Sequence, residues 1–174
     1  MILTVDEARD LFPAGTADAA IGALLDAVEG VIRAYTNNPF QVRAARFVAP
    51  SAGSVLAGAS PYIAAGDTVQ ISGSGVNDGL YVVRGVTKAG TALEGEIYDA
   101  PYNLVTRIAY PAAVRAVAQN MLRWEANNRS KVGVKAETLS RYSVTYYDQD
   151  AGNQVMGYPV SLLGGLKPYM KARF

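Results

Sequence analysis

The chain has 174 residues, of which half are hydrophobic and 18% are charged, a composition typical of a globular protein with a real core. It contains no cysteine and no histidine, which excludes disulfide frameworks, thiol nucleophiles, imidazole bases and zinc sites built on these residues. Sixteen basic and fifteen acidic residues leave a net charge of +1, so the chain as a whole has no strong attraction to nucleic acid or to an anionic membrane.

The first residues lack the basic region and the long apolar run of a secretory signal. The longest uncharged stretch, residues 47–66, is broken up by prolines, glycines and serines, so it predicts strands and turns rather than a membrane helix. We therefore expect a soluble protein that is made in a cytoplasm and has no membrane partner.

Two helices are predicted at the start of the chain. Thr4 and Glu7 have the spacing of a capping box, and the short helix that follows is stopped by Pro13. Apolar residues at helical spacing then predict a longer helix with one buried stripe, formed by Ile21, Leu24, Leu25, Val28, Ile32 and Tyr35. The sequence Asn-Asn-Pro at residues 37–39 predicts its end, because asparagine tolerates a left-handed cap and proline blocks continuation.

From about residue 42 to residue 108 the helical periodicity disappears and β-forming residues dominate. A run rich in glycine, asparagine and aspartate at residues 73–79 predicts a tight turn. Short strands are predicted at residues 68–71, 80–86, 92–98 and 104–108. Several short strands at close spacing indicate a small antiparallel sandwich or barrel.

Helix returns after Pro111, a residue suited to the first helical position. Residues 141–147 alternate in polarity and predict a strand, and a turn at residues 148–153 makes that strand half of a hairpin. The last element begins at Pro159, and its two adjacent glycines and a further proline predict a short or broken helix.

Together these elements predict an α+β fold. We expect a small helical bundle of about four helices with a C-terminal β-hairpin, and a small antiparallel β module inserted between the second and third helices. The helical body would comprise residues 1–41 and 105–174, and the sandwich-like or barrel-like insert would comprise residues 42–104.

Few residues carry a pattern typical of catalysis or metal binding. Glu94 and Glu96 would share one face of a strand, but no partner acid or base is indicated for them. Asp148 and Asp150 are better explained by turn chemistry than by calcium binding. The glycines of residues 73–79 miss the phosphate-loop spacing, and a strand rather than a helix follows them. We therefore predict a protein that is not an enzyme and has no catalytic residues, no cofactor and no metal site.

The charges are separated along the chain. Residues 1–40 carry two basic and six acidic side chains, residues 41–110 carry five of each, and residues 111–174 carry nine basic and four acidic ones. The net charge thus runs from −4 through 0 to +5. Three interpretations remain open: a nucleic-acid surface in the basic third, head-to-tail association between subunits, and balance within one subunit.

Two stretches resemble a known family. Residues 133–146 resemble the Gly-x-x-Ser-Glu-x-x-Gly-x-Tyr-Ser-x-Thr-Tyr pattern of head–tail connector (head-completion, adaptor) proteins of tailed double-stranded-DNA phages. Residues 158–173 look like their C-terminal Leu-x-Pro-Tyr-basic ending, and the helices of residues 1–40 are also similar. Ala136 and Ser140 depart from the pattern, where the family often has serine and glycine.

The resemblance covers roughly residues 1–40 and 105–174, which leaves residues 42–104 as an insert similar to small β modules of other phage structural proteins. It implies a non-enzymatic protein of the virion, made in the bacterial host cytoplasm and located at the head–tail junction. Such adaptors form a ring of about twelve subunits under the portal protein. The ring extends the DNA channel, encloses DNA without reading its sequence, and offers a platform for a stopper or tail-completion protein.

The resemblance and the charge pattern together suggest two interfaces. The expected portal-binding residues are Tyr158, Leu162, Leu166, Lys167, Tyr169, Lys171, Arg173 and Phe174. The expected inter-subunit residues are Asp6, Asp10, Asp26, Arg115, Arg123, Arg129 and Lys131. The C-terminal segment is expected to be loose in an isolated subunit, because its two adjacent glycines give it little rigidity. The alternative function is a sequence-independent DNA-binding module that uses the basic C-terminal third.

Overall fold

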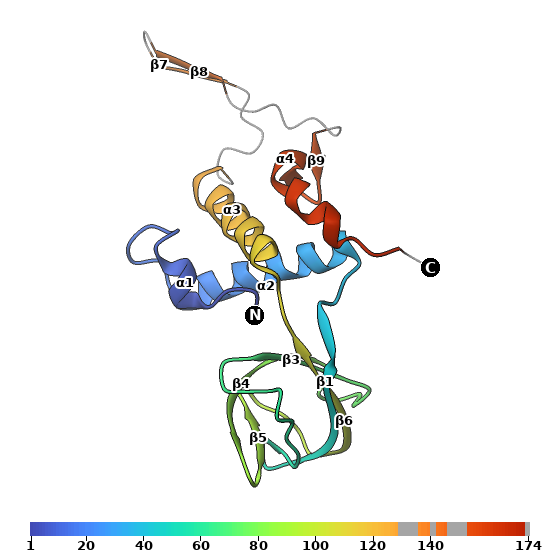
Figure 1. Cartoon of the computed structure of the whole chain (residues 1–174). Helices are drawn as coiled ribbons and strands as arrows, with labels where there is room; N and C mark the ends of the chain where they lie inside the picture. Colours follow the sequence, from blue (N-terminus) through green and yellow to red (C-terminus); the bar gives the residue numbers. More distant parts are fainter. Residues whose placement is uncertain (129–135, 140–141, 146–152, 173–174) are drawn as a thin grey trace. The chain divides into compact units, whose positions relative to one another are not determined.

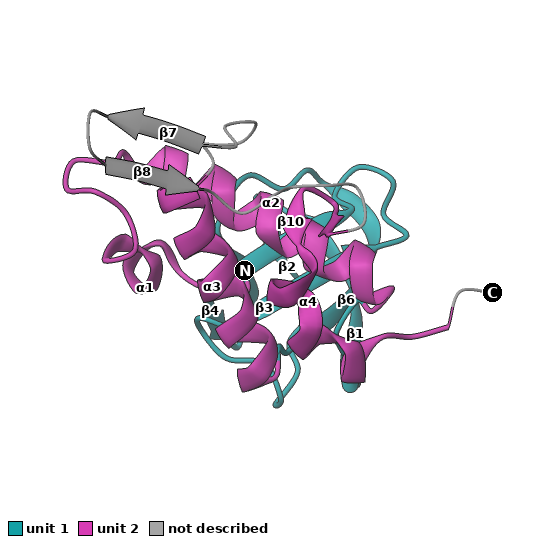
Figure 2. Ribbon diagram, turned by 90° about the horizontal axis from the view of Figure 1, so that it is seen from above, with its two compact units in different colours: residues 1, 39–110 teal, residues 2–38, 111–174 magenta. Residues whose placement is uncertain are grey.

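A computed structural model of the whole chain is shown in Figure 1. It describes residues 1–128, 136–139, 142–145 and 153–172. The chain divides into two compact units, coloured separately in Figure 2. One unit contains residue 1 and residues 39–110, and is built on a β-barrel. The other, helical, unit contains residues 2–38 and 111–174.

The helical unit begins with the capping box that the sequence predicts. Thr4 Oγ1 accepts a hydrogen bond from Glu7 N at 3.2 Å, and Glu7 Oε2 accepts one from Thr4 N at 2.9 Å, which starts α1 (Val5–Arg9). The longer α2 (Asp18–Thr36) buries one stripe of apolar side chains against the rest of the unit. It ends at Asn37, whose φ of 48° is the predicted left-handed cap.

The third helix of this unit is α3 (Ala112–Asn128), which contacts α2. Its buried apolar side chains are Val114, Val117, Ala118, Met121 and Leu122. The C-terminal segment follows as α4 (Val160–Leu163) and the 3-10 helix η2 (Gly164–Tyr169), and both contact α3. Leu163 and Leu166 are fully buried, so this short segment completes the core of the helical unit.

Two short strand pairs precede α4. The antiparallel pair of β7 (Ala136–Leu139) and β8 (Tyr142–Thr145) joins strands that are neighbours in sequence. The described part of the strand predicted at residues 141–147, residues 142–145, therefore pairs with the chain before it. The rest of that strand and most of the predicted turn at residues 148–153 lie outside the described residues. The second pair, β9 (Gln154–Val155) and β10 (Tyr158–Pro159), leads directly into α4.

The barrel consists of six antiparallel strands that close in the order β1-β2-β5-β4-β3-β6. Their bounds are β1 (Gln41–Ala52), β2 (Val55–Leu56), β3 (Thr68–Ser72), β4 (Gly79–Thr87), β5 (Gly90–Leu93) and β6 (Ala100–Ile108). The interior is filled by small and branched aliphatic side chains, among them Ala45, Ala49, Leu56, Ile63, Val69, Ile71, Val83, Leu93, Ile97 and Val105. Small residues on β1 leave room for branched ones on the facing strands, as a narrow barrel requires.

The first and last strands of the barrel are partners along most of their length. Gln41 pairs with Ile108 at one end, and Ser51 pairs with Ala100 at the other. Just outside the barrel, Ala109 N donates a hydrogen bond to Phe40 O at 3.0 Å, and the rings of Phe40 and Tyr110 lie 4.9 Å apart. The chain therefore enters and leaves the barrel at adjacent points.

The predicted fold class, a small helical bundle with a C-terminal β-hairpin and a small β insert, is wrong. The largest architectural element is the closed six-stranded barrel, whose β1 has twelve residues and whose β6 has nine. Among the described helices only α2 and α3 are long, whereas α1 has five residues and α4 four. The physical reason is that barrel closure depends on pairing between β1 and β6, whose partner residues lie about fifty to seventy positions apart in sequence, and local periodicity carries no information on such distant pairs.

Candidate functional site

Three loops meet at one end of the barrel and form the best-organised surface of that unit. They are the β1–β2 turn at residues 53–54, the β3–β4 loop at residues 73–78 and the β5–β6 loop at residues 94–99. Asp99 Oδ1 accepts a hydrogen bond from Gly53 N at 2.9 Å, which ties the first loop to the third. We call this region the loop end of the barrel.

A buried polar network holds the loop end together. Asn77 of the β3–β4 loop and Asn103 of β6 are 1% and 0% exposed, and Asn77 Nδ2 donates to Asn103 Oδ1 at 3.0 Å. The Asn77 side chain also accepts from Tyr98 N at 2.8 Å and lies 2.9 Å from Tyr98 O. Since buried amides are costly when unpaired, a fully paired network fixes the geometry of the loops it joins.

Ser51 on β1 connects the same network to the first strand. Its Oγ donates to Tyr98 O at 2.7 Å and accepts from the side-chain amides of Asn77 and Asn103 at 3.2 and 3.1 Å. Asn103 Nδ2 also donates to Ala49 O at 3.1 Å. Two strands and two loops are thus joined through three small polar side chains.

The glycine-rich β3–β4 loop is organised by its own aspartate. Asp78 Oδ1 accepts hydrogen bonds from Ser74 N and Gly75 N at 2.8 and 3.3 Å. Gly73 and Gly75 adopt φ values of 73° and 78°, which glycine reaches without strain. The loop amides that a phosphate would need are therefore already used by a carboxylate, and the loop is a turn, as the sequence predicts.

Three large side chains are exposed at the loop end. Val76 and Tyr98 are 59% and 60% exposed. Val76 precedes Asn77 in the chain, and the backbone amide of Tyr98 donates a hydrogen bond to the Asn77 side chain. Tyr102, which is 45% exposed, lies across Gly73, where a Cβ would be 3.4 Å from its ring. We call Val76, Tyr98 and Tyr102 the loop-end patch. Exposed large side chains held by a rigid frame are typical of protein interfaces.

Tyr81 on β4 lies near the same patch. Partial burial raises the pKa of its hydroxyl, and the negative charge of Asp78 and the neighbouring Tyr98 raise it further. A phenol in this setting stays protonated well above neutral pH and is available as a hydrogen-bond donor.

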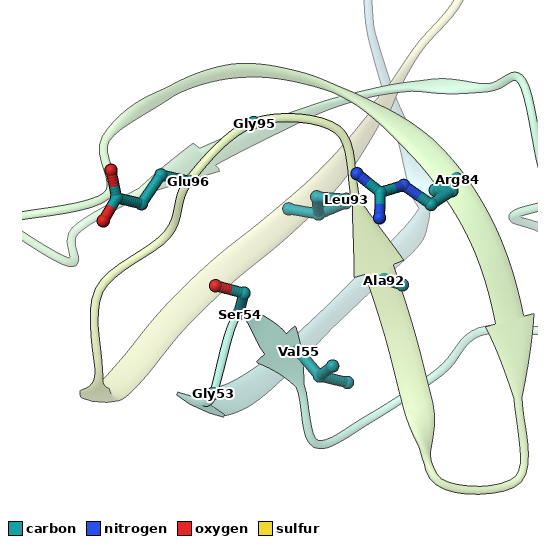
Figure 3. A pocket seen from close by; sticks show the side chains of 8 residues that line it. All are labelled: Gly53, Ser54, Val55, Arg84, Ala92, Leu93, Gly95 and Glu96. Atoms are coloured by element: carbon teal, nitrogen blue, oxygen red, sulfur yellow. The ribbon is translucent and has the colours of Figure 1, made fainter.

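A pocket of about 480 Å³ lies beside the loop end, and Figure 3 shows its lining. Val55 and Leu93 contribute apolar surface, whereas Arg84 on β4 and Glu96 in the β5–β6 loop contribute opposite charges. The remaining lining residues are Gly53, Ser54, Ala92 and Gly95. The pocket can accept a side chain of a partner molecule, with an apolar part against Leu93 and a polar part at Arg84 or Glu96.

Glu94 and Glu96 do not share a strand face. The strand predicted at residues 92–98 stops at Leu93, and Gly95, with a φ of 90°, turns the chain between the two glutamates. Both side chains are exposed. The alternation that would have brought two carboxylates together for acid–base chemistry is therefore missing.

The expected portal-binding residues fall into four groups. Tyr158 and Leu166 are 3% and 0% exposed, with the ring of Tyr158 at 5.5 Å from that of Trp124, so their side chains form core rather than surface. Leu162 and Tyr169 are partly buried. Lys167 and Lys171 are exposed. Arg173 and Phe174 lie outside the described residues.

The C-terminal segment is also held by hydrogen bonds to the end of α2. Asn38 Nδ2 donates to Tyr169 O at 3.0 Å, and Asn37 Nδ2 donates to Ala172 O at 2.8 Å. Lys171 N donates to Thr36 O at 2.8 Å. The segment expected to be loose is packed in the described structure, because the asparagines that cap α2 also bind its backbone.

The expected inter-subunit residues are only partly available. Asp6, Asp10 and Asp26 are exposed. Arg115 on α3 forms an ion pair with Glu7 at 2.5 Å within the same unit, so its charge is already paired. Arg123 is exposed and hydrogen-bonded to Asn120 on its own helix. Arg129 and Lys131 lie outside the described residues.

No group of three or more acidic residues within the described ranges is arranged to hold a metal ion. Within the same ranges, no helix has the length and apolar character needed to cross a membrane.

The chain matches no protein-family model, and no curated protein is significantly similar to it.

Proposed function

We propose that this chain is a structural adaptor of the virion of a tailed phage, which assembles as a ring under the portal protein. In that place it would extend the DNA channel and provide a platform for a stopper or tail-completion protein. The proposal rests on the resemblance of residues 1–40 and 105–174 to phage connector proteins.

One structural observation carries the proposal further than the sequence does. Leu166 and Tyr169 belong to the Leu-x-Pro-Tyr ending, and the structure gives both a role in closing the helical unit. Leu166 fills the core, and the carbonyl of Tyr169 accepts the side-chain amide of Asn38, from the Asn-Asn-Pro sequence that the resemblance also includes. Two separated segments of the resemblance thus depend on each other, which supports reading them as one inherited unit.

The test is assembly on a portal. The purified chain, mixed with the portal protein of the phage that encodes it, is expected to co-sediment and to add one ring to the portal in electron micrographs. An unchanged portal, with the chain left in the supernatant, would contradict the proposal.

Point variants test the portal-binding surface better than a truncation does. Deleting residues 158–174 would remove Leu163 and Leu166 from the core, so a loss of binding could result either from unfolding or from a lost portal contact. K167E/K171E instead reverses two exposed charges and is expected to abolish co-sedimentation. The matched control, R43E/K88E, makes the same change in net charge on exposed residues of the barrel that do not line the pocket, and it is expected to bind normally.

The DNA-binding alternative predicts a different outcome. Duplex DNA would be bound tightly by the monomer, and a gel-shift assay would show affinity falling steeply with salt. The adaptor proposal expects weak binding without this steep dependence, because Arg115 of the basic third is already paired with Glu7.

A further inference from the structure

The loop-end patch is preorganised for binding. Val76, Tyr98 and Tyr102 are exposed, yet the backbone beneath them is held by the buried network of Ser51, Asn77 and Asn103. A partner therefore meets side chains on a rigid frame and does not have to order the loops. Such preorganisation lowers the entropic cost of association.

The charged residues of the loops around the patch are of one sign, whereas the basic Arg84 on β4 lines the pocket beside them. Four of the five carboxylates of residues 41–110 lie in the loops of this end, and residues 73–79 and 94–103 contain no lysine or arginine. Asp78 and Asp99 accept hydrogen bonds from backbone amides, and no ion pair is formed by either of them within the described part of the chain. The four residues are Asp78, Glu94, Glu96 and Asp99. The occupant of this surface should therefore be basic.

The chain itself carries the complementary charge. Residues 111–174 have a net charge of +5, and Arg123 is exposed on α3, where its described hydrogen bond is to the neutral Asn120. We propose that the loop end of the barrel binds a second copy of this chain on the α3 surface around Arg123.

This contact is heterologous, since it joins two different surfaces. Each bound copy still offers a loop end and an α3 surface, so the same contact can be repeated and can close into a ring. The inference deepens the proposed ring assembly and rests on it for its biological meaning. It also changes the expected acidic side of the inter-subunit contact, from the helical residues Asp6, Asp10 and Asp26 to the barrel.

Sedimentation velocity of the full chain over a range of concentrations at low salt tests the contact directly. The wild-type chain is expected to associate, and higher salt is expected to weaken its association. E94K/E96K and R123E are each expected to remain monomeric, whereas an equimolar mixture of the two variants is expected to form a complex. The mixture recovers one intact contact, because each variant lacks a different half of it.

Two further variants separate this contact from general charge effects and from misfolding. D10K/D26K makes the same change in net charge as E94K/E96K, but on exposed positions of the helical unit, and is expected to associate like the wild type. Y98A leaves the charge unchanged and is expected to weaken association by about tenfold or more, as for an exposed aromatic anchor. Unchanged thermal unfolding of each variant, followed by circular dichroism, establishes that the fold is retained.

The inference is overturned if the wild-type chain stays monomeric throughout, or if E94K/E96K associates as the wild type does. It is also overturned if D10K/D26K is the variant that fails. Failure of the proposed function looks different: the wild-type chain would then associate through the loop end and still not bind the portal. Conversely, normal ring assembly on the portal by E94K/E96K would leave the adaptor proposal standing without this contact.

Discussion

At the scale of single residues, Glu7 connects two helices of the helical unit. Its carboxylate accepts the Thr4 backbone amide in the capping box and pairs with Arg115 of α3. The Thr4 hydrogen bond is the main cause that lowers the pKa of Glu7, partial burial opposes it, and Arg115 lowers the pKa further. The ionised form is therefore favoured in the folded state.

This shift predicts a stability difference that depends on pH. Because the folded-state pKa is the lower one, the stabilisation is complete above the unfolded value of about 4.3 and is lost as the pH falls through the folded-state pKa. E7Q is expected to lower the free energy of unfolding by a few tenths of a kcal/mol at pH 7, since the group is partly exposed. Urea unfolding at pH 7 and pH 3 checks this: the difference between E7Q and wild type should shrink at pH 3, and a constant difference would contradict the assignment.

Gly90 is the residue where the barrel has least room. Its φ is 145°, and a Cβ there would lie 2.1 Å from Leu56 O, the backbone of the neighbouring strand. G90A is expected to destabilise the chain by about 3 kcal/mol or more, because both the conformation and the contact with backbone must change. The matched control is G85A on β4, where a Cβ meets nothing within 4 Å. Similar urea midpoints for the two variants would show that the close contact at Gly90 does not determine the stability of the G90A variant.

At the scale of elements, the C-terminal segment behaves as part of the helical core. Leu166 in η2 is fully buried and Leu162 in α4 is only partly so. L166A is therefore expected to cost about 2–5 kcal/mol of unfolding free energy, and L162A clearly less. Chemical denaturation of both variants provides the check. If L166A were as stable as the wild type, the segment would not be packed as described, and the expectation of a loose C-terminus would regain support.

How far the sequence predicts each element depends on how local its determinants are. The start of α1 was predictable from the capping box of Thr4 and Glu7, and the end of α2 was predictable from its asparagine cap, because both signals act within a few residues. The spacing of the strands indicated a sandwich or a barrel, but it could not show that the sheet closes, because closure depends on distant pairs such as Gln41 with Ile108. The packing of η2 was missed for a similar reason. Gly164 and Gly165 favour a flexible segment locally, but the side chain of the distant Asn38 donates a hydrogen bond to the carbonyl of Tyr169 and holds the segment in place.

The loop end was missed because its determinants are single polar residues. Asn103 lies inside β6, where asparagine is uncommon, and this was the one available signal that a buried polar contact was needed there. Asn77 gave no such signal, since asparagine is ordinary in a glycine-rich turn. The exposure of Val76 and Tyr98 follows only from the three-dimensional structure.

At the scale of the whole molecule, each compact unit has a core of its own. The barrel residues pack around their own apolar cluster, and the strands close on themselves. Residues 39–110 expressed alone are therefore expected to fold, with cooperative thermal unfolding and a β-sheet circular dichroism spectrum. A chain without a cooperative transition would mean that the barrel depends on the helical unit.

The pairing of Gln41 with Ile108 has a consequence for the order of folding. Helices α2 and α3 are separated in sequence by about seventy residues, and bringing them together across an unfolded connection of that length costs about 4 kcal/mol of chain entropy. Once the barrel has formed, its two chain ends are held about 5 Å apart, so most of the chain entropy of this connection has already been lost before the two helices meet. The barrel is therefore expected to form before α2 and α3 pack against each other. In a refolding experiment, the amides of the helical unit are expected to become protected against hydrogen exchange only after those of the barrel.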